Sequence, residues 1–402
     1  MRRLFTLFLF LVSCCIASAQ GELNYSVKGM VLDASSGRPL PVVGVTVPGR
    51  NFATVTNADG TFVIKADRPI TQLKFSRIGY RDCWEADPQG ELKVRMVPIA
   101  YPLKGAAIVS GDPLEIIDAA LKRIRENYPS KPELLRCFYR ETLQKRQRYI
   151  SINEAVARIY KRPYYYMNSH ADAAALEKSR VIMSQRPSDT LNVRVMGGPT
   201  LAVTFDAVKN DDIFFNEKDM ALYTFAMESP AYLADRLQFV ISFEPARTAE
   251  YALYYGKLYI DRETLAFSRI EMSLDVSDED KATRVMLVKK PRGLRFTPRE
   301  MTLTITYRQQ DGISRLDYFR SSMSFRCDSK ARLLATNYKV VNELVVTDLI
   351  EPAVPIAREE QFRPRDIMED KAPLFLDPDF WKDYNIIEPT ESLEHAVARL
   401  RK

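Results

Sequence analysis

The sequence Thr-Val-Thr-Asn-Ala-Asp-Gly-Thr-Phe-Val-Ile at residues 54–64 decides the fold of the N-terminal part of this chain. Asp59-Gly60 is a pair typical of a tight hairpin turn, because glycine adopts positive φ without steric cost. Short alternating segments of the same kind surround it, with GMVLD at 29–33, GRPLP at 37–41, VGVTV at 43–47 and FSRIGY at 75–80. This pattern predicts a small antiparallel β-sandwich of Greek-key type, with Val45, Phe62, Ile64 and Phe75 in its core.

The spacing of these residues resembles the carboxypeptidase-regulatory-like domain, a transthyretin-like sandwich common in cell envelopes of the Bacteroidetes type. The resemblance covers roughly residues 25–105 and rests on Gly29, Val31, Asp33, Gly37, Pro39, Leu40, Val43, Val45, Thr54, Thr56, Asp59, Gly60, Phe62, Ile78, Gly79 and Tyr80. In metallocarboxypeptidases this domain accompanies a catalytic zinc domain with a His-x-x-Glu motif. Neither His170 nor His395 begins that motif. The resemblance therefore implies architecture and location, and we expect surface histidines, no metal and no cofactor.

The first residues have the three parts of an export signal. Arg2-Arg3 provides the positive end, the run from Leu4 to Val12 is almost wholly apolar, and Ala17-Ser18-Ala19 is a cleavage site of the A-x-A kind. Residues 1–19 are thus predicted to be a signal peptide, too short to span a membrane. Leu11-Val12-Ser13-Cys14 offers an alternative, since it resembles a lipobox that would leave a lipidated Cys14. Both readings predict an exported protein in the periplasm or at the outer membrane.

The composition limits the classes of function and the disulfide pattern that the chain can have. The 402 residues suggest two or three domains, and the net charge of +6 is dispersed too evenly to favour nucleic-acid binding. Beyond the signal, the cysteines are Cys83, Cys137 and Cys327. We expect three buried, inert thiols, with one disulfide and one free thiol as the alternative.

A helix is expected after the sandwich. Residues 101–109 read as an extended connector, Asp112 suits an N-cap and Pro113 the first helical position. Leu114, Ile117, Leu121 and Ile124 follow at helical spacing, and Tyr128-Pro129 ends the element. Its basic residues are expected to face solvent, with contact to a membrane surface as the alternative.

The region from about 137 to 349 is mostly β by pattern. Predicted strands lie at 149–160, 257–261, 266–272, 284–288, 301–307, 316–325 and 338–344. They alternate apolar and polar residues between turns, which predicts an antiparallel meander. The fold class is therefore mainly β with flanking helices, a sandwich followed by a larger half-barrel-like sheet over residues 112–350.

Two segments of the larger part resemble known families. Residues 255–267 resemble the G-x-x-Y-I-D-x-x-T hairpin of LolA-like lipoprotein carriers and related periplasmic half-barrels. Residues 112–161 resemble the start of an uncharacterised domain that follows regulatory-like modules in envelope proteins. The first resemblance implies a half-barrel and raises lipid or lipoprotein carriage as an alternative function.

Aromatic residues gather around Pro163. Tyr160, Tyr164, Tyr165 and Tyr166 are the candidate ligand or partner surface, because such rings stack on sugars or sit at a membrane interface. The alternative is that these rings fill the core.

Residues 351–402 are expected to form an extended strap and a C-terminal helix. Prolines and charges dominate 351–371, and 377–387 carry an apolar anchor. Thr390 then caps a helix with Leu393, Val397 and Leu400 on one side, which we expect to pack on the sheet.

No catalytic motif is present: the sequence has no nucleophile elbow, phosphate-binding loop, dinucleotide fingerprint or metal-ligand spacing. We therefore predict a non-catalytic exported protein that binds or scaffolds in the envelope. Its partner is an envelope protein, a glycan or a lipid, with peripheral or lipid-anchored membrane association. The alternatives are an enzyme with an unmarked carboxylate pair directed at glycosides and a periplasmic lipid carrier.

Overall fold

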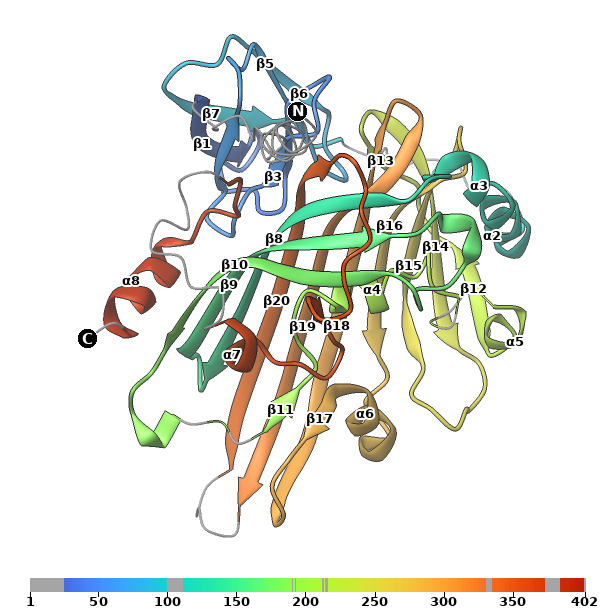
Figure 1. The fold of residues 1–402 in the computed structure, drawn as a ribbon. Helices are drawn as coiled ribbons and strands as arrows, with labels where there is room; N and C mark the ends of the chain where they lie inside the picture. The colour runs from blue at the N-terminus through green and yellow to red at the C-terminus, as the bar shows by residue number, and fades with distance from the viewer. Residues whose placement is uncertain are drawn as a thin grey trace, which may run out of the picture.

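The structure, a computed structural model, describes residues 25–99, 111–189, 191, 193–211, 213, 216–329, 335–372 and 384–400. A small β-sandwich lies at the upper end of a large curved sheet (Figure 1). The predicted signal peptide, the connector at 101–109, and Phe380 with Trp381 lie outside the described residues.

The sandwich consists of a three-stranded sheet of order β4-β1-β7 and a four-stranded sheet of order β3-β2-β5-β6. Its strands are β1 (Tyr25–Asp33), β2 (Gly44–Thr46), β3 (Ala53–Val55), β4 (Thr61–Ala66), β5 (Gln72–Ser76), β6 (Cys83–Ala86) and β7 (Glu91–Met96). The four predicted core residues, Val45, Phe62, Ile64 and Phe75, are fully buried. Phe62 and Phe75 meet edge to face, with ring centroids 5.4 Å apart.

One pairing corrects the expectation of a wholly antiparallel sandwich. Strand β7 runs parallel to β1, from Lys28 opposite Glu91 to Asp33 opposite Met96. The chain passes through β5 and β6 in the other sheet before it returns, so it can enter beside β1 in the same direction.

The large sheet has twelve strands in the order β12-β14-β15-β16-β18-β19-β20-β8-β9-β10-β21, with β13 paired to β14. All its pairings are antiparallel. The predicted half-barrel-like sheet is confirmed. Its strands are β8 (Glu133–Lys145), β9 (Arg148–Lys161), β10 (Ala173–Met183), β12 (Tyr223–Met227), β13 (Ala231–Leu233), β14 (Arg236–Pro245), β15 (Tyr254–Asp261), β16 (Phe267–Leu274), β18 (Leu294–Gln310), β19 (Ile313–Ser329), β20 (Thr336–Ile350) and β21 (Gln361–Phe362).

The inner face of this sheet carries the main core, which includes Tyr139, Ile270 and Phe319. Short elements pack over it: α2 (Pro113–Lys122), α3 (Ile124–Asn127), α4 (Leu201–Thr204), α5 (Glu217–Met220), α6 (Glu279–Met286), α7 (Met368–Lys371), and the small pair β11 (Arg194–Val195) with β17 (Leu287–Lys289). As predicted, Asp112 caps the first helix and accepts from the Leu114 N–H at 2.9 Å. The helix breaks at Arg123, so the single predicted helix is two.

The predicted strand at 284–288 is wrong. Residues 279–286 form α6, because the Asp278 carboxylate accepts hydrogen bonds from the Asp280 and Lys281 N–H groups and caps the helix. Ala282 and Met286 then lie one turn apart on its buried face. Only Leu287–Lys289 is extended, in β17.

The described C-terminal residues form an edge strand, an extended segment and a helix. Strand β21 pairs with the edge of β10, and α8 (Glu391–Leu400) packs Leu393, Ala396 and Leu400 on Ile152 and Ile182. Between them, Tyr384, Ile386 and Ile387 lie in an apolar cluster with Val55 of the sandwich and Phe138, Val156, Tyr318 and Val345 of the sheet. The described part of the chain contains no helix long and apolar enough to cross a membrane.

Candidate functional site

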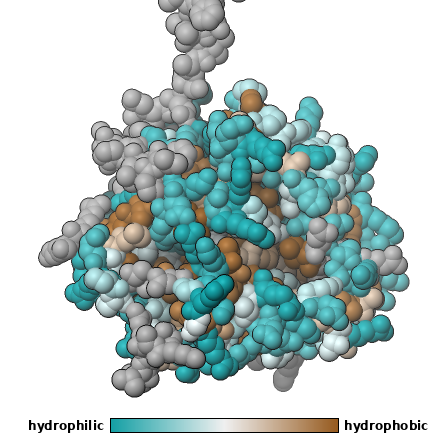
Figure 2. All heavy atoms as spheres, turned by 60° about the horizontal axis from the view of Figure 1, so that its bottom comes forward, coloured by the Kyte–Doolittle hydropathy of each residue, from teal (hydrophilic) through white to brown (hydrophobic). Residues whose placement is uncertain are grey.

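A pocket of about 330 Å³ lies on the inner side of the large sheet, under residues 183, 184, 189, 191, 193–197, 367, 369 and 370. We call it the Glu141 pocket. The apolar part of its wall consists of Leu143, Ile150, Met183, Leu191, Val193, Val195, Met196, Val340 and Ile367, and the rest is lined by Glu141, Ser151, Ser184, Asp189, Arg194, Gly197, Glu369 and Asp370. Figure 2 views the molecule from the lower end of the sheet in Figure 1 and shows hydrophobic residues in the middle of that face, with hydrophilic residues around them.

Two carboxylates enter this pocket from distant parts of the chain. Strand alternation places Tyr139, Glu141 and Leu143 of β8 on the inner face, and α7 brings Glu369 over it. The Asn153 amide donates to Glu141 Oε1 and to Glu369 Oε1, at 3.1 Å in each case. One side-chain amide therefore holds the two carboxylates together.

Further donors surround the Glu141 carboxylate. The Tyr139 hydroxyl lies 2.8 Å from Glu141 Oε2, and the Gly198 N–H donates to the same oxygen at 3.4 Å. The Gly198 N–H also donates to the Tyr139 hydroxyl at 2.7 Å. A Cβ at Gly197 would lie 2.4 Å from Glu141 Oε2, so a larger residue there would push the Glu141 carboxylate from its position.

The environment raises the pKa of Glu141 to about 7. Burial is the largest cause and the charge of Glu369 the second, while the hydrogen bonds from Tyr139, Asn153 and Gly198 oppose them. Among the described residues, no basic side chain forms an ion pair with either carboxylate. Glu141 therefore takes up a proton close to neutral pH, which is the behaviour expected of a binding or reactive site.

The other acids of the pocket are neutralised by partners. Asp189 pairs with Arg148 at 2.6 Å and Lys145 at 3.5 Å, and Asp370 pairs with Arg194 at 3.2 Å. Unbalanced negative charge is thus confined to Glu141 and Glu369.

The four candidate tyrosines do not form one surface. Tyr164 is buried: its hydroxyl donates to Asp206 Oδ2 at 2.8 Å, and its ring stacks on Tyr128 with centroids 4.9 Å apart. Tyr160 is partly buried in a cluster with Leu134, Ala175 and Ile356. Tyr160 and Tyr164 thus follow the alternative interpretation, in which the rings fill the core. The predicted ligand or partner surface is wrong at Tyr164.

Tyr165 and Tyr166 do lie at the surface. Their ring centroids are 4.6 Å apart, the Arg125 guanidinium lies over Tyr165 at 4.7 Å, and that of Arg162 over Tyr166 at 3.9 Å. With both rings already covered by an arginine, only part of this pair faces solvent.

Asp206 is the centre of a fully buried polar network. Besides Tyr164, it accepts from Tyr307 at 2.5 Å and forms an ion pair with Lys161 at 2.6 Å. These contacts satisfy the carboxylate within the core, so the network holds α4 to the sheet and presents no open site.

The histidines and thiols carry no site either. His170 and His395 are both exposed, as predicted. Cys137 and Cys327 are buried free thiols, whereas Cys83 is half-buried, which corrects the prediction of three buried thiols. Within the described ranges, no group of three or more His, Cys, Asp or Glu side chains is arranged to hold a metal ion.

Sequence reasoning missed the carboxylate pair. Glu141 and Glu369 are far apart in the chain, and no motif relates them. Of the two, only Glu141 has a sequence signal. It is a charged residue two positions after Tyr139, so both lie on the same, otherwise apolar face of a strand.

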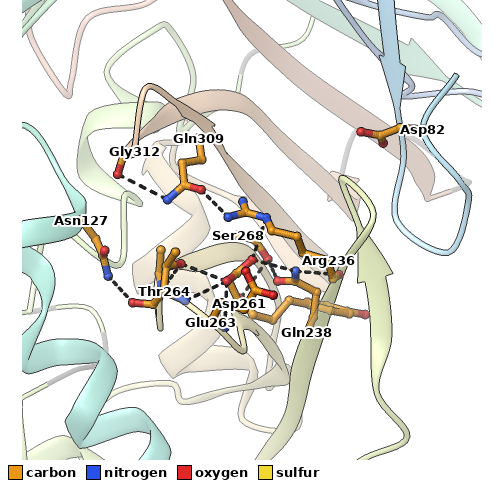
Figure 3. Close-up of polar contacts among 12 residues, drawn as sticks. Asp82, Asn127, Arg236, Gln238, Asp261, Glu263, Thr264, Ser268, Gln309 and Gly312 are labelled. Carbon is orange, nitrogen blue, oxygen red and sulfur yellow. Dashed lines mark hydrogen bonds and ion pairs between the residues drawn. The ribbon is translucent and has the colours of Figure 1, made fainter. Parts of the chain in front are cut away.

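A second hollow, of about 220 Å³, lies between the sandwich and the large sheet. We call it the interdomain cleft. On the sheet side, Arg236 is held between Gln309 and Asp261, and the Asn127 amide donates to the Thr264 carbonyl in the turn after β15 (Figure 3).

Comparison with known proteins identifies the sandwich. Residues 27–96 match the model of a family described as the CarboxypepD_reg-like domain, so this part of the chain is a carboxypeptidase-regulatory-like domain. No curated protein matches the chain.

Some solved structures show a distant likeness. One is a DUF1329 family protein from Desulfovibrio piger, with 11% identity over 62% of this chain and 100% of that chain, at a TM-score of 0.25. Another is MucB in complex with MucA(peri), with 14% identity over 64% and 100%, at 0.17. A LolA superfamily protein from Nitrosomonas europaea has 10% identity over 60% and 96%, at 0.20. Scores this low carry no argument about function.

Proposed function

We propose that this chain is a non-catalytic binding protein of the cell envelope, and that the Glu141 pocket takes a small amphipathic molecule with a cationic group. The observation behind this proposal is the pair Glu141 and Glu369, which lacks a basic partner among the described residues and lies beside an apolar wall. The wall suits an aliphatic body, and the carboxylates suit an ammonium group. A volume of about 330 Å³ is at the small end of the range for ligand pockets.

The hydrogen bonds of Asn153 favour binding over catalysis. A glycosidase needs the space between its two carboxylates for the scissile bond and, in inverting enzymes, for a water. Here the Asn153 amide lies between Glu141 and Glu369 and binds both. A bound cation would instead replace the missing positive partner without any bond being broken.

Placement in the envelope rests on the sequence. The three-part signal at residues 1–19 and the carboxypeptidase-regulatory-like domain at 27–96 both support an exported protein. We infer that the sandwich joins the protein to an envelope partner, while the larger sheet provides the ligand pocket.

The test compares three eight-carbon probes that differ in their head group: n-octylammonium, octanol and octanoate. Titration calorimetry of the chain from Gln20 onward at about pH 8 should show binding of n-octylammonium in preference to the other two. Glu141→Gln and Glu369→Gln should each weaken that binding about tenfold or more, a loss of about 1.4 kcal/mol. Glu360→Gln is the matched control, since Glu360 pairs with Arg158 away from the pocket at 2.8 Å. Equal binding of octanoate, or full binding by Glu141→Gln, would overturn the proposal.

Lipid carriage is the second candidate, and the apolar wall of the same pocket favours it. A carrier would move a fluorescent phospholipid between vesicles, and Met183→Asp or Val340→Asp in the wall would stop that transfer. Binding of octylammonium without any lipid transfer would leave the first proposal standing alone.

A further inference from the structure

The interdomain cleft gathers basic side chains from both parts of the chain. Its lining contains six basic residues, Arg50, Lys74 and Arg77 from the sandwich and Arg236, Arg269 and Arg308 from the large sheet. Only two acids, Asp261 and Asp317, line it with them. Low-dielectric walls on both sides strengthen the field of such a group of cations.

Most of these cations already have a carboxylate partner. The pairs are Lys74 with Asp82 at 2.7 Å, Arg50 with Asp67 at 3.5 Å, Arg236 with Asp261 at 3.1 Å, Arg308 with Asp317 at 3.3 Å, and Arg269 with Glu271 at 2.7 Å. Asp82 projects from the sandwich apart from the group around Arg236 (Figure 3).

Arg77 is different. It follows β5 directly, is partly buried, and its guanidinium lies over the Tyr80 ring at 5.2 Å from the centroid. Among the described residues it has no carboxylate partner and no hydrogen-bond acceptor. The Tyr80 hydroxyl donates to Asp33 at 2.7 Å, and no hydrogen bond joins Arg77 to this hydroxyl. Burial is the largest cause that lowers the pKa of Arg77, and the charge of Arg269 acts in the same direction, while Tyr80 and Asp33 oppose them.

Two guanidinium groups from different parts of the chain thus share one small hollow, and one of them has unused donors. We propose that Arg77 and Arg269 bind a phosphoryl anion in the interdomain cleft. A guanidinium presents paired N–H donors that match phosphate oxygens, and a dianion relieves the repulsion between two such groups. Ser76 lines the same cleft and adds a hydroxyl donor, whereas the Ser268 and Thr306 hydroxyls there donate to Gln238 and to the Tyr318 carbonyl.

The size of the cleft limits the ligand. At roughly 30 Å³ for each water, a volume of about 220 Å³ holds about seven waters. That is room for inorganic phosphate with its hydration or for the phosphoryl head of a larger molecule, and too little for a stretch of polymer.

Binding there has a consequence for the whole chain. Because Arg77 belongs to the sandwich and Arg269 to β16, an anion between them contacts both parts at once. It therefore stabilises the docked arrangement and raises the temperature of unfolding. This site and the Glu141 pocket are separate, so the inference does not depend on the proposed function.

The experiment is calorimetric titration of the chain from Gln20 onward with inorganic phosphate, at an ionic strength kept constant with sodium chloride. We expect one site per chain and a rise in the unfolding temperature. Arg77→Gln and Arg269→Gln should each weaken phosphate binding at least tenfold. Arg77→Lys keeps the positive charge but lacks the paired N–H donors of a guanidinium. It should bind phosphate weakly while folding normally. Arg68→Gln is the matched control, because Arg68 is an exposed sandwich arginine.

Vesicles distinguish the two sources of a phosphoryl group. Co-sedimentation with phosphatidylglycerol vesicles but not with phosphatidylcholine vesicles, lost in Arg77→Gln, identifies an anionic lipid head group. Phosphate binding without co-sedimentation identifies a free phosphoryl compound. The proposal is overturned if neither probe binds, if Arg77→Gln and Arg77→Lys bind as the parent does, or if chloride competes as well as phosphate.

Discussion

The side-chain amide of Asn385 bonds with both backbone polar groups of Lys65. The Lys65 N–H donates to Asn385 Oδ1 at 2.6 Å, and Asn385 Nδ2 donates to the Lys65 carbonyl at 2.9 Å. Lys65 lies on β4, an edge strand of the sandwich, so one amide side chain takes the place of a neighbouring strand. Nearby, Asn57 Nδ2 donates to the carbonyls of Glu388 and Pro389 at 3.1 Å each.

Asn385→Ala should loosen the sandwich from the rest of the chain. The change leaves two partly buried backbone groups without partners, at a cost of about 1–3 kcal/mol. We expect faster proteolytic cleavage between the sandwich and β8, with the secondary structure unchanged by circular dichroism. Gln89→Ala, an exposed change in the same part, is the control. Cleavage at the parent rate would show that this contact does not hold the sandwich.

Phe62→Ala should destabilise the sandwich by about 3–5 kcal/mol, because Phe62 is fully buried and the change leaves a cavity beside Phe75. Denaturant unfolding of the full chain, followed in the far ultraviolet, measures the loss. Phe62→Leu should recover most of it. A Phe62→Ala chain as stable as the parent would remove Phe62 from the core.

Glu141→Gln should flatten the dependence of stability on pH. The pKa of Glu141 is raised from 4.5 to about 7, so the folded chain holds a proton that the unfolded chain has already released. The stability from that protonation is fully present below the unfolded pKa and is lost as the pH rises through about 7. Between about pH 5 and pH 8 the parent should lose on the order of a few kcal/mol, and Glu141→Gln clearly less. Identical slopes in chemical unfolding across this range would contradict the assigned pKa.

Asp206→Asn should be among the most damaging single changes, because it leaves buried Lys161 with only the more distant carboxylate of Asp172, at 3.7 Å, as a charged partner. Breaking a buried ion pair costs about 3–5 kcal/mol. Tyr307→Phe removes a single hydrogen bond to Asp206 and should cost less. Thermal unfolding of both variants tests this order, and a larger loss in Tyr307→Phe would refute it.

The N-terminus of the mature protein should begin at Gln20, since Ala17-Ser18-Ala19 is the predicted cleavage site. Intact-mass measurement of protein from the native host decides this. A lipid-modified Cys14 would support the lipobox alternative, and an unprocessed chain in the cytoplasm would contradict both.

The sandwich could be predicted in detail because its signals are local. Val43, Val45 and Val47 alternate with Gly44 and Thr46, and Asp59-Gly60 makes a tight turn, although this turn leads from β3 in one sheet to β4 in the other and not into a hairpin. The hairpin of β15 and β16 could also be predicted from the sequence, since its two strands flank a short turn. Helix α6 was missed because its apolar residues, read as a run, suit a strand, whereas the deciding feature is the cap at Asp278.

The candidate site was beyond sequence reasoning for a different reason. Strand β8 carries Glu141 and pairs with β20, which lies much later in the sequence. Glu369 lies on α7, in the C-terminal segment that covers these strands. Neither of these two relationships can be recognised from a local sequence pattern. Arg77 and Arg269 meet only because the sandwich docks on the large sheet, so their relation depends on the whole arrangement.

The segment 384–390 gives the protein a built-in order of assembly. All strands of the sandwich lie within residues 25–96, so this part can fold early during synthesis and translocation, ahead of the larger sheet. The residues that seat it, Tyr384 to Pro389, are translated long afterwards. A chain interrupted before them would keep only the remaining contacts between the two parts, such as the hydrogen bond from the Gly79 N–H to the Tyr232 carbonyl at 2.8 Å. The region between the parts should then be more sensitive to protease than in the full chain.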